Sequence, residues 1–180
     1  MAKNIIYFDL ETQKSAAEVG GWDRIAEMKM SIGVTYSTAR GSYEIYDESR
    51  AQDLVQELLR ADLIVGFNVL RFDFTVLQAY SLFDFSGVPC LDIMVDLEKT
   101  CGVRLPLDGV AEATLGLTKT SEGTQALKWW KEGRVREIAE YCCYDVKITK
   151  CVHEFGVAHG KVHFKDKETQ LIRDIPVAWG

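Results

Sequence analysis

The chain has 180 residues, of which 47% are hydrophobic and 27% charged, and this profile fits one globular domain with a sizeable core. Its formal charge of −6 argues against a broad surface for polyanions, although acids gathered in one metal site would still permit a local contact with nucleic acid. No apolar stretch reaches the about 20 residues that span a bilayer, and the five cysteines include no C-x-x-C pair, so we expect a cytoplasmic protein without membrane contact.

The first predicted strand begins at Asn4 and ends in two acids, Asp9 and Glu11. Side chains of a strand alternate between its two faces, so these carboxylates point the same way. Two carboxylates this close repel each other and resist leaving water. A hard divalent cation with oxygen ligands would relieve both costs, so the pair predicts a metal site.

Strand and helix patterns alternate along the rest of the chain. A loop containing Gly20-Gly21-Trp22 precedes strands at residues 30–36, 42–46, 63–65 and 88–91, with a hairpin turn at 39–41. The predicted helices run from an N-cap at Ser49 to Arg60, from near Asp73, in short pieces broken at Gly102, Gly116 and Gly123, and from Arg134 to Phe155.

This order of elements predicts an α/β fold, a mixed five-stranded sheet flanked by helices. We expect a single domain over residues 1–180, with its core at about 4–164. A short strand is expected at 161–164, and the tail at 165–180 has no pattern that places it.

Two further acids stand near positions where apolar residues are expected. Asp73 follows a strand and lies near a helix N-terminus, where the helix dipole favours an acid by about 0.3–1 kcal/mol. Asp145 falls within the apolar stripe of the last helix, and Tyr141 precedes it by one turn on the same side. A buried carboxylate needs a partner or becomes protonated, so a partner is expected there. The stripe comprises Val135, Ile138, Cys142, Thr149 and Val152.

Three motifs along the chain resemble those of the DEDD exonuclease superfamily, which has an RNase H-like fold. They are Phe-Asp-Leu-Glu-Thr at residues 8–12, Gly-Phe-Asn at 66–68 followed by Phe-Asp at 72–73, and Tyr-Cys-Cys-Tyr-Asp at 141–145. The spacing of Tyr141 and Asp145 fits the tyrosine (DEDDy) branch, since Glu140 stands where the histidine branch has its histidine. The second motif is similar to that of the proofreading domains of family-B DNA polymerases and their stand-alone relatives.

The resemblance implies a role for each acid. Asp9, Glu11 and Asp145 would ligate one Mg²⁺ or Mn²⁺, and Asp9 would bridge to a second ion that Asp73 reaches directly or through water. Two ions about 3.5–4 Å apart stabilise the attacking and leaving oxygens of an in-line phosphoryl displacement. Tyr141 would orient the attacking water or take its proton. The product would be a nucleoside 5′-monophosphate.

The resemblance also implies the substrate contacts. The backbone near Leu10 and Thr12 would lie against the terminal nucleotide, with Asn68 close to the cleft. Trp22 either stacks on a terminal base or anchors a buried loop. The expected substrate is the 3′ end of a single strand, DNA in preference to RNA. A polymerase or helicase working in trans is the partner this family suggests.

Taken singly, the same residues have simpler interpretations. Asp9 and Glu11 fit a strand end in solvent, Asp73 an N-cap, and Asp145 with Tyr141 a buried hydrogen-bonded pair. The whole protein has two alternatives to the exonuclease: a nucleic-acid-binding or partner-recruiting module that keeps the fold without turnover, and an endonuclease. Asp92 resembles a recurring acid of the fold and is expected to be structural. The cysteines and histidines lack the spacing of a zinc site.

Overall fold

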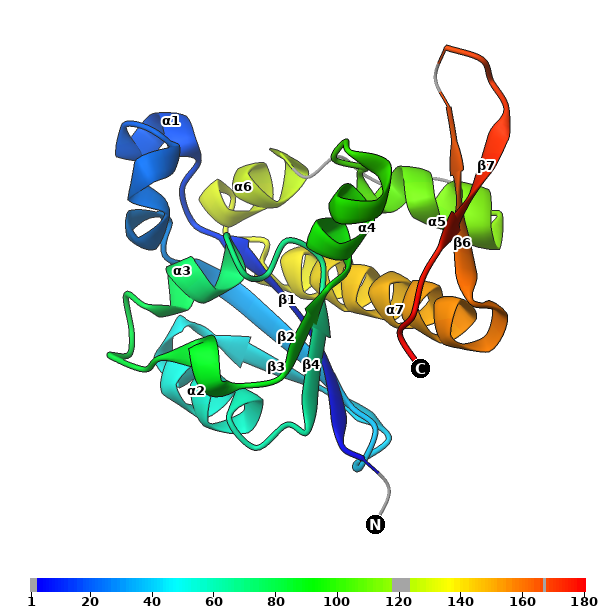
Figure 1. Cartoon of the computed structure of the whole chain (residues 1–180). Helices are drawn as coiled ribbons and strands as arrows, with labels where there is room; N and C mark the ends of the chain where they lie inside the picture. The colour runs from blue at the N-terminus through cyan, green and yellow to red at the C-terminus, as the bar shows by residue number, and fades with distance from the viewer. Residues whose placement is uncertain (1–2, 118–123, 167) are drawn as a thin grey trace.

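Five strands form the central sheet of the molecule, and the computed structural model describes residues 3–117, 124–166 and 168–180 (Figure 1). The strands are β1 (Ile5–Thr12), β2 (Met30–Ser37), β3 (Ser42–Asp47), β4 (Leu63–Gly66) and β5 (Cys90–Asp92). Their order across the sheet is β3-β2-β1-β4-β5. The β1–β2 and β2–β3 pairs are antiparallel, whereas β1–β4 and β4–β5 are parallel. The predicted mixed five-stranded α/β sheet is confirmed.

Helices cover both faces of this sheet (Figure 1). One face packs against α1 (Ala16–Val19), the 3₁₀-helix η1 (Trp22–Met28), α2 (Ala51–Leu58), α3 (Asp73–Leu77) and the 3₁₀-helix η3 (Phe85–Gly87). The other face packs against α4 (Ile93–Cys101), α5 (Leu107–Leu115), α6 (Thr124–Lys131) and α7 (Val135–His159). Apolar side chains on both faces of the inner strands explain why the sheet is covered on both sides.

The central strand β1 divides its side chains between the two cores. Ile6, Phe8 and Leu10 belong to the core under α2 and α3, whereas Tyr7 belongs to the core under α7. Because residues two apart share a face, Asp9 and Glu11 must face the α7 side. The strand ends at Thr12, one residue after Glu11, so its predicted end at the acid pair is confirmed to within one residue.

The long helix α7 packs against β1 and β2. Its last residue is His159, and Gly160 with a φ of 66° ends it in the left-handed conformation that glycine adopts without strain. The predicted apolar stripe needs two corrections. Val135, the first residue of the helix, is exposed, and Asp145 lies half-buried beside the stripe rather than within it. The buried residues are Ile138, Cys142, Val146, Ile148, Thr149, Val152, His153 and Gly156.

The predicted N-cap at Ser49 is also wrong. A short 3₁₀-helix, η2 (Glu48–Arg50), comes before α2, and Asp47 caps it by accepting a hydrogen bond from the Arg50 backbone N–H at 3.2 Å. Both residues suit an N-cap, so the sequence did not distinguish them. The predicted break at Gly123 lies outside the described residues.

The unplaced tail forms an antiparallel hairpin with the strand that precedes it. β6 (Lys161–Lys165) pairs with β7 (Ile172–Pro176), and the hairpin projects from the body of the molecule (Figure 1). Trp179 then returns to α7 and stacks on His153 at 5.9 Å between ring centroids. Its indole N–H donates to Asp96 Oδ2 of α4 at 2.7 Å, so the end of the chain ties α4 to α7.

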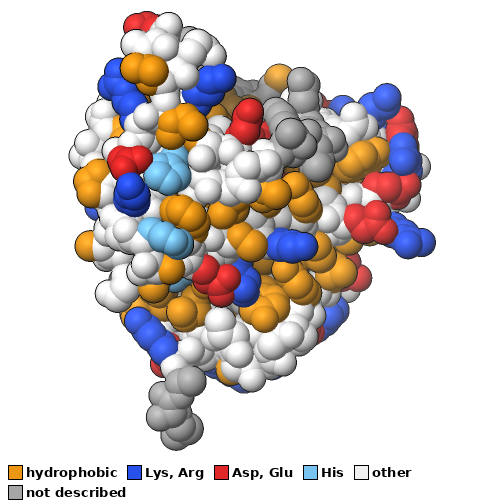
Figure 2. Space-filling view, turned by 90° about the vertical axis from the view of Figure 1, so that its right-hand side faces the viewer, with side chains coloured by type: hydrophobic (Ala, Val, Ile, Leu, Met, Phe, Trp, Pro, Cys, Tyr) orange, Lys and Arg blue, Asp and Glu red, His pale blue; other side chains and the backbone are white. Residues whose placement is uncertain are grey.

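Two further observations concern the surface charge on one face and the character of the helices. Across the face in Figure 2, Lys and Arg side chains lie scattered among Asp and Glu and form no continuous basic tract. Among the described residues, we find no helix with the length and apolar character to cross a membrane. Any anion site must therefore be local on that face.

Candidate metal centre

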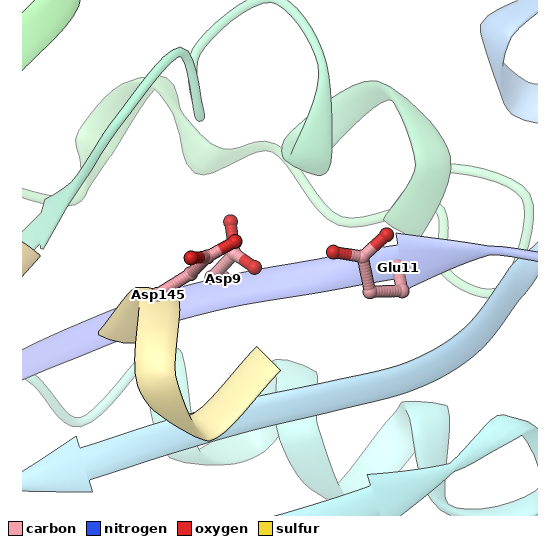
Figure 3. Close-up of side chains that lie close together, drawn as sticks. All are labelled: Asp9, Glu11 and Asp145. Atoms are coloured by element: carbon pink, nitrogen blue, oxygen red, sulfur yellow. The ribbon is translucent and has the colours of Figure 1, made fainter. Parts of the chain in front are cut away.

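Three carboxyl groups from two distant parts of the chain meet at β1. Oxygen atoms of Asp9, Glu11 and Asp145 all lie within 4.8 Å of one another. Figure 3 shows the three groups on one side of the β1 ribbon, Asp9 and Asp145 together and Glu11 farther along the strand. Asp145 arrives from α7, more than 130 residues later in the sequence. The four predicted metal ligands thus include three that the fold brings together.

A contact between Cys142 of α7 and Asp9 of β1 explains why Asp145 lies beside the two strand acids. The Cys142 Sγ lies 3.4 Å from the Asp9 carbonyl oxygen and 3.3 Å from Asp9 Oδ2, and its thiol donates to them. This contact holds one turn of α7 directly against β1. Asp145 follows Cys142 by three residues, so it lies on the same side of the helix and beside the strand acids.

The fourth predicted ligand, Asp73, is buried next to this group but outside it. Its Oδ1 accepts a hydrogen bond from the Leu10 backbone N–H at 3.0 Å. β4 pairs with β1 only as far as Tyr7, so Leu10 has no strand partner on that edge and Asp73 satisfies its N–H. Asp73 therefore approaches β1 midway between the two strand acids.

The electrostatics of the site call for added positive charge. Burial raises the pKa of Asp9 well above its usual range, and the charges of Asp73, Asp145 and Glu11 raise it further. Burial and the charges of Asp145 and Asp73 likewise raise the pKa of Glu11. Burial raises the pKa of Asp73 to about 8, although the Leu10 N–H partly offsets this. Carboxylate oxygens are the ligands that Mg²⁺ and Mn²⁺ prefer, so the donor set fits such an ion.

Tyr141 lies against the same acids. Burial raises the pKa of Asp145 to about 7, and so does the charge of Asp108, while a hydrogen bond from Tyr141 lowers it. Burial raises the pKa of Tyr141, and the charges of Asp145, Glu11 and Asp9 raise it further, so the phenol keeps its proton at neutral pH. The Trp129 ring packs edge-on against Tyr141 at 6.2 Å between centroids, which fixes the phenol beside Asp145.

The model of the RNase H superfamily matches residues 6–155 of this chain. The chain belongs to the RNase H superfamily. The match ends before the β6–β7 hairpin, so that hairpin and Trp179 are additions to the part that the family model covers.

A solved structure shares the fold of this RNase H-like chain. The family B DNA polymerase from the hyperthermophilic archaeon Pyrobaculum calidifontis superposes with a TM-score of 0.65 at 17% sequence identity. The alignment covers 87% of this chain and 25% of the polymerase chain, so this chain spans about a quarter of the length of that protein. No curated protein matches the sequence.

Two residues near the acids of this RNase H-like chain were not predicted as part of the site. Cys142 was assigned only to the apolar stripe, and its contact with Asp9 depends on how α7 crosses β1, which no local pattern reveals. Asp108 lies in the first turn of α5 and raises the pKa of both Asp145 and Tyr141. Its sequence surroundings resemble an ordinary acidic helix start, so nothing in them indicates this proximity.

The residues predicted to contact substrate occupy different surroundings. Leu10 is a core residue, and its backbone N–H is used by Asp73. Thr12 is buried, and its hydroxyl donates to the Lys14 carbonyl oxygen at 3.0 Å. Asn68 has a φ of 64°, and its buried Oδ1 has no hydrogen-bond partner among the described residues.

Asp92 holds the Asn68 loop in place. Its carboxylate accepts from the backbone N–H groups of Asn68 at 2.8 Å and Leu70 at 3.0 Å, and it caps α4 through Val95 at 3.3 Å. This is the structural role expected of Asp92. Three backbone donors on one carboxylate explain how a non-glycine residue is kept at a positive φ.

Of the two interpretations of Trp22, a stacking residue or a buried loop anchor, the second is wrong. Its side chain is 62% exposed, so it is not a buried loop anchor. It stands on η1 with its ring edge-on to Phe72 at 6.4 Å between centroids. A large aromatic surface therefore remains open to a ligand.

Proposed function

We propose that this protein is a metal-dependent 3′–5′ exonuclease that releases 5′-mononucleotides from single strands, DNA in preference to RNA. The observation that carries the proposal is the meeting of Asp9, Glu11 and Asp145 within 4.8 Å, with Asp73 bound to the strand between the first two. An RNase H superfamily member with a polymerase-like fold and the three ordered motifs supports a nuclease.

The acids divide into two ligand groups in this proposal. Asp9, Glu11 and Asp145 would hold one Mg²⁺ or Mn²⁺, and Asp9 with Asp73 a second. When bound, such a pair of ions lowers the pKa of a water nucleophile and stabilises charge on the attacking and leaving oxygens. The carboxylates would hold the ions. Without the ions, their negative charge would repel the phosphodiester of the substrate.

Tyr141 positions the nucleophilic water. Burial and three nearby acids raise its pKa, which favours the protonated phenol, and its hydroxyl would hold the water through a hydrogen bond. Asp145 accepts the hydrogen bond that orients the phenol.

Direction and substrate rest on the resemblance to proofreading domains. The aligned solved protein is described as a DNA polymerase, which favours DNA over RNA. This chain spans a quarter of that protein. A polymerase or a helicase acting in trans is the partner that the resemblance suggests.

The test compares degradation of matched DNA and RNA single strands labelled at the 5′ or the 3′ end. We expect mononucleotide release from the 3′ end with Mg²⁺ or Mn²⁺ and none in EDTA. Asp145→Asn should lower the rate by about 100-fold or more, because several kcal/mol of charge stabilisation depend on the bound ions. Glu140→Gln is the matched control, since Glu140 is an exposed acid on the same helix paired with Arg136.

Three outcomes would contradict the proposal. Inert substrates with both metals would favour the binding module that keeps the fold without turnover. Internal cuts would favour the endonuclease. Full activity of Asp145→Asn would show that the ligand set is wrong.

A further inference from the structure

The β6–β7 hairpin has one edge that the rest of the molecule covers and one that it leaves open. The hairpin lies beyond residues 6–155, which the family model matches, and it projects from the body of the molecule (Figure 1). Its β6 edge packs on α5, where the Thr114 hydroxyl accepts from the His163 N–H at 2.9 Å and donates to the His163 carbonyl oxygen at 3.1 Å. Both backbone groups of His163 are therefore satisfied on the side away from β7.

The hydrogen-bond pattern of the hairpin shows which groups of β7 face outward. Antiparallel pairs alternate between those that exchange backbone hydrogen bonds and those that do not. His163 and its opposite residue Asp174 form a pair of the second kind. The Val177 N–H donates to the Gly160 carbonyl oxygen at 3.0 Å, three pairs away, which agrees with this alternation. The backbone N–H and C=O groups of Asp174 and Ile172 therefore lie on the outer edge of β7.

This outer edge has no partner strand. Among the described residues, no hydrogen bond reaches the outward backbone groups of Ile172 or Asp174. The edge ends at Pro176, which has no N–H. Proteins usually cover or shorten such edges, as Thr114 covers β6 here, because an open edge pairs readily with another strand. The β7 edge therefore suits an extended peptide that binds by strand addition.

A cavity of about 340 Å³ runs along this edge. Its lining includes residues 173–176 of β7 and, from the end of α4 and the loop that follows, Cys101, Val103 and Leu105. Successive side chains of a strand point to opposite faces, so a cavity lined by four consecutive residues lies along the strand edge. The Val103 side chain is 57% exposed, and Leu105 is buried beneath it. Apolar side chains of an added strand would find apolar contacts there.

The outer face of the hairpin carries positive charge. Residues opposite each other in an antiparallel pair share a face, so Lys161, His163 and Lys165 lie on the face of Asp174. Asp174 accepts from Lys161 Nζ at 2.5 Å and lies 2.8 Å from His163 Nδ1. Lys165 is exposed and, within the described part of the chain, has no acid at ion-pair distance. Two lysines against one acid, in a protein of net charge −6, favour an acidic partner.

The charges of β7 itself disfavour a second copy of this chain as the occupant. Antiparallel pairing of two β7 strands about Arg173 would set this guanidinium opposite its own copy. Pairing about Asp174 would set two carboxylates opposite each other. Like charges directly opposite in a sheet are destabilising.

We propose that the open edge of β7 binds an extended acidic peptide of another protein by strand addition. The peptide backbone pairs with Ile172 and Asp174. Its apolar side chains enter the cavity beside Val103, and the alternate, acidic side chains face Lys161 and Lys165. This binding is independent of the exonuclease activity, since no residue of the metal centre lines the cavity.

The first test measures fluorescence polarisation of two labelled peptides, Glu-Val-Glu-Val-Glu and Lys-Val-Lys-Val-Lys. We expect the acidic peptide to bind at least tenfold more tightly. Lys165→Glu should reduce this preference, whereas Lys14→Glu is the matched control, because Lys14 is an exposed lysine in the loop after β1. No binding of the acidic peptide at millimolar concentration, or equal affinity for both peptides, would overturn the proposal.

The second test removes the outward N–H of β7. Asp174→Pro leaves the β6–β7 hydrogen bonds in place, because the Asp174 N–H takes no part in them. Asp174→Ala is the matched control, since it removes the same carboxylate and keeps the N–H. Asp174→Pro should bind the acidic peptide at least tenfold less tightly than Asp174→Ala. Equal affinities of the two variants would overturn strand addition.

A change in the peptide tests the same point on wild-type protein, so it does not depend on how the proline variant folds. Methylating the backbone nitrogens of either the glutamates or the valines removes the donors from one edge of the peptide. One of the two methylated peptides should lose binding and the other should keep it. Loss in both, or in neither, would contradict pairing along a single edge.

Sedimentation equilibrium without peptide distinguishes the other occupant. We expect Asp174→Pro and Asp174→Ala to have the same oligomeric state. A dimer of Asp174→Ala that Asp174→Pro does not form would show that the edge binds a second copy of this chain, and would overturn the proposal.

Discussion

The Cys142 thiol lies 3.3 Å from Asp9 Oδ2, a contact that joins α7 to the central strand at the acids themselves. Cys142 is fully buried, and burial together with the charges of Asp9 and Glu11 raises its pKa well above the usual range. The thiol is therefore a neutral donor. Such a donor holds the Asp9 carboxylate in one orientation whether or not an ion is bound.

Replacing Cys142 should weaken metal binding without touching a ligand. Cys142→Ala removes the donor, and we expect Mn²⁺ affinity to fall at least about tenfold, as is typical when the support of a ligand is lost. Cys142→Ser keeps a donor and should lose less. Cys143→Ala is the control, because Cys143 is the neighbouring thiol, and among the described residues the thiol contact with Asp9 comes from Cys142. Calorimetric titration with Mn²⁺ measures the affinities, and unchanged affinity in Cys142→Ala would contradict the expected role.

Asp73 combines a structural and a ligand role that two variants can separate. Asp73→Asn keeps the Oδ1 that accepts from Leu10, and because the pKa of Asp73 is about 8 the metal-free carboxyl is largely neutral at pH 7. We expect Asp73→Asn to melt close to wild type in EDTA, whereas Asp73→Ala should lose about 1–3 kcal/mol through the unpaired Leu10 N–H. Both should lose the part of the Mn²⁺ stabilisation that comes from the second ion, which Asp9 and Asp73 would hold. An Asp73→Asn protein that Mn²⁺ stabilises as much as wild type would remove Asp73 from the ligand set.

The pH dependence of metal-free stability follows from the raised pKa values of the acids. Asp145 and Asp73 have folded-state pKa values of about 7 and about 8, above the 3.8 of the unfolded chain. The folded state therefore binds more protons than the unfolded state, and stability is lost as the pH rises through the folded values. In EDTA the melting temperature should therefore fall as the pH rises from about 6.5 to 8.5. His153 is kept neutral in the folded state and gains a proton on unfolding only at lower pH, so it does not affect the melting temperature in this range.

The doubly substituted Asp73→Asn/Asp145→Asn protein is the control for this slope. It lacks two titrating groups and should show a flatter dependence in EDTA. Saturating Mg²⁺ should raise the melting temperature of wild type more at pH 8.5 than at pH 6.5, because ion binding displaces the protons. A wild-type melting temperature that rises with pH in EDTA over this range would contradict the assignment of raised pKa values.

Much of the fold was predictable because its signals are local. The alternation of β1, the hairpin between β2 and β3 and the short parallel strand β4 each follow from periodicity and turn residues within about ten positions. The apolar spacing of α7 predicted its start at Arg134 to within one residue and its end at Phe155, four residues before the observed end at His159. The tail was not predictable, because β7 pairs with β6 across a turn and Trp179 packs on α7, and neither contact leaves a pattern in the tail itself.

In the candidate site, too, some residues have a local sequence signal and others are revealed only by tertiary contacts. Asp9 and Glu11 are recognisable from the sequence as two acids in a buried strand. Asp145 and Tyr141 are recognisable as polar residues on the apolar side of a helix. Their meeting in space came from the family resemblance rather than from any local rule. Cys142 and Asp108 were missed as members of the site because their influence depends on the distance between α7, β1 and α5, which only the tertiary structure supplies.

Packing of the chain end against α7 makes the last prediction. A Cβ on Gly156 would meet Trp179 Cε3 at 2.3 Å, so the glycine allows the indole to lie on the helix. Gly156→Ala should destabilise the protein by about 1–3 kcal/mol through this overpacking. In a Trp179→Ala background only the contact with Val177 Cγ2 at 3.2 Å remains, so the same change should destabilise by much less than in wild type, and helix propensity should offset the remaining cost.

A double-mutant cycle measured by urea unfolding in EDTA tests this packing. The four proteins are wild type, Gly156→Ala, Trp179→Ala and the double variant. If Gly156→Ala destabilises the protein less in the Trp179→Ala background than in wild type, the coupling free energy shows that the indole and a side chain at position 156 compete for the same space. If Gly156→Ala destabilises the protein equally in both backgrounds, the Trp179 indole does not pack on Gly156 in solution. The link from α7 through the Trp179 indole to Asp96 of α4 would then be absent in solution as well.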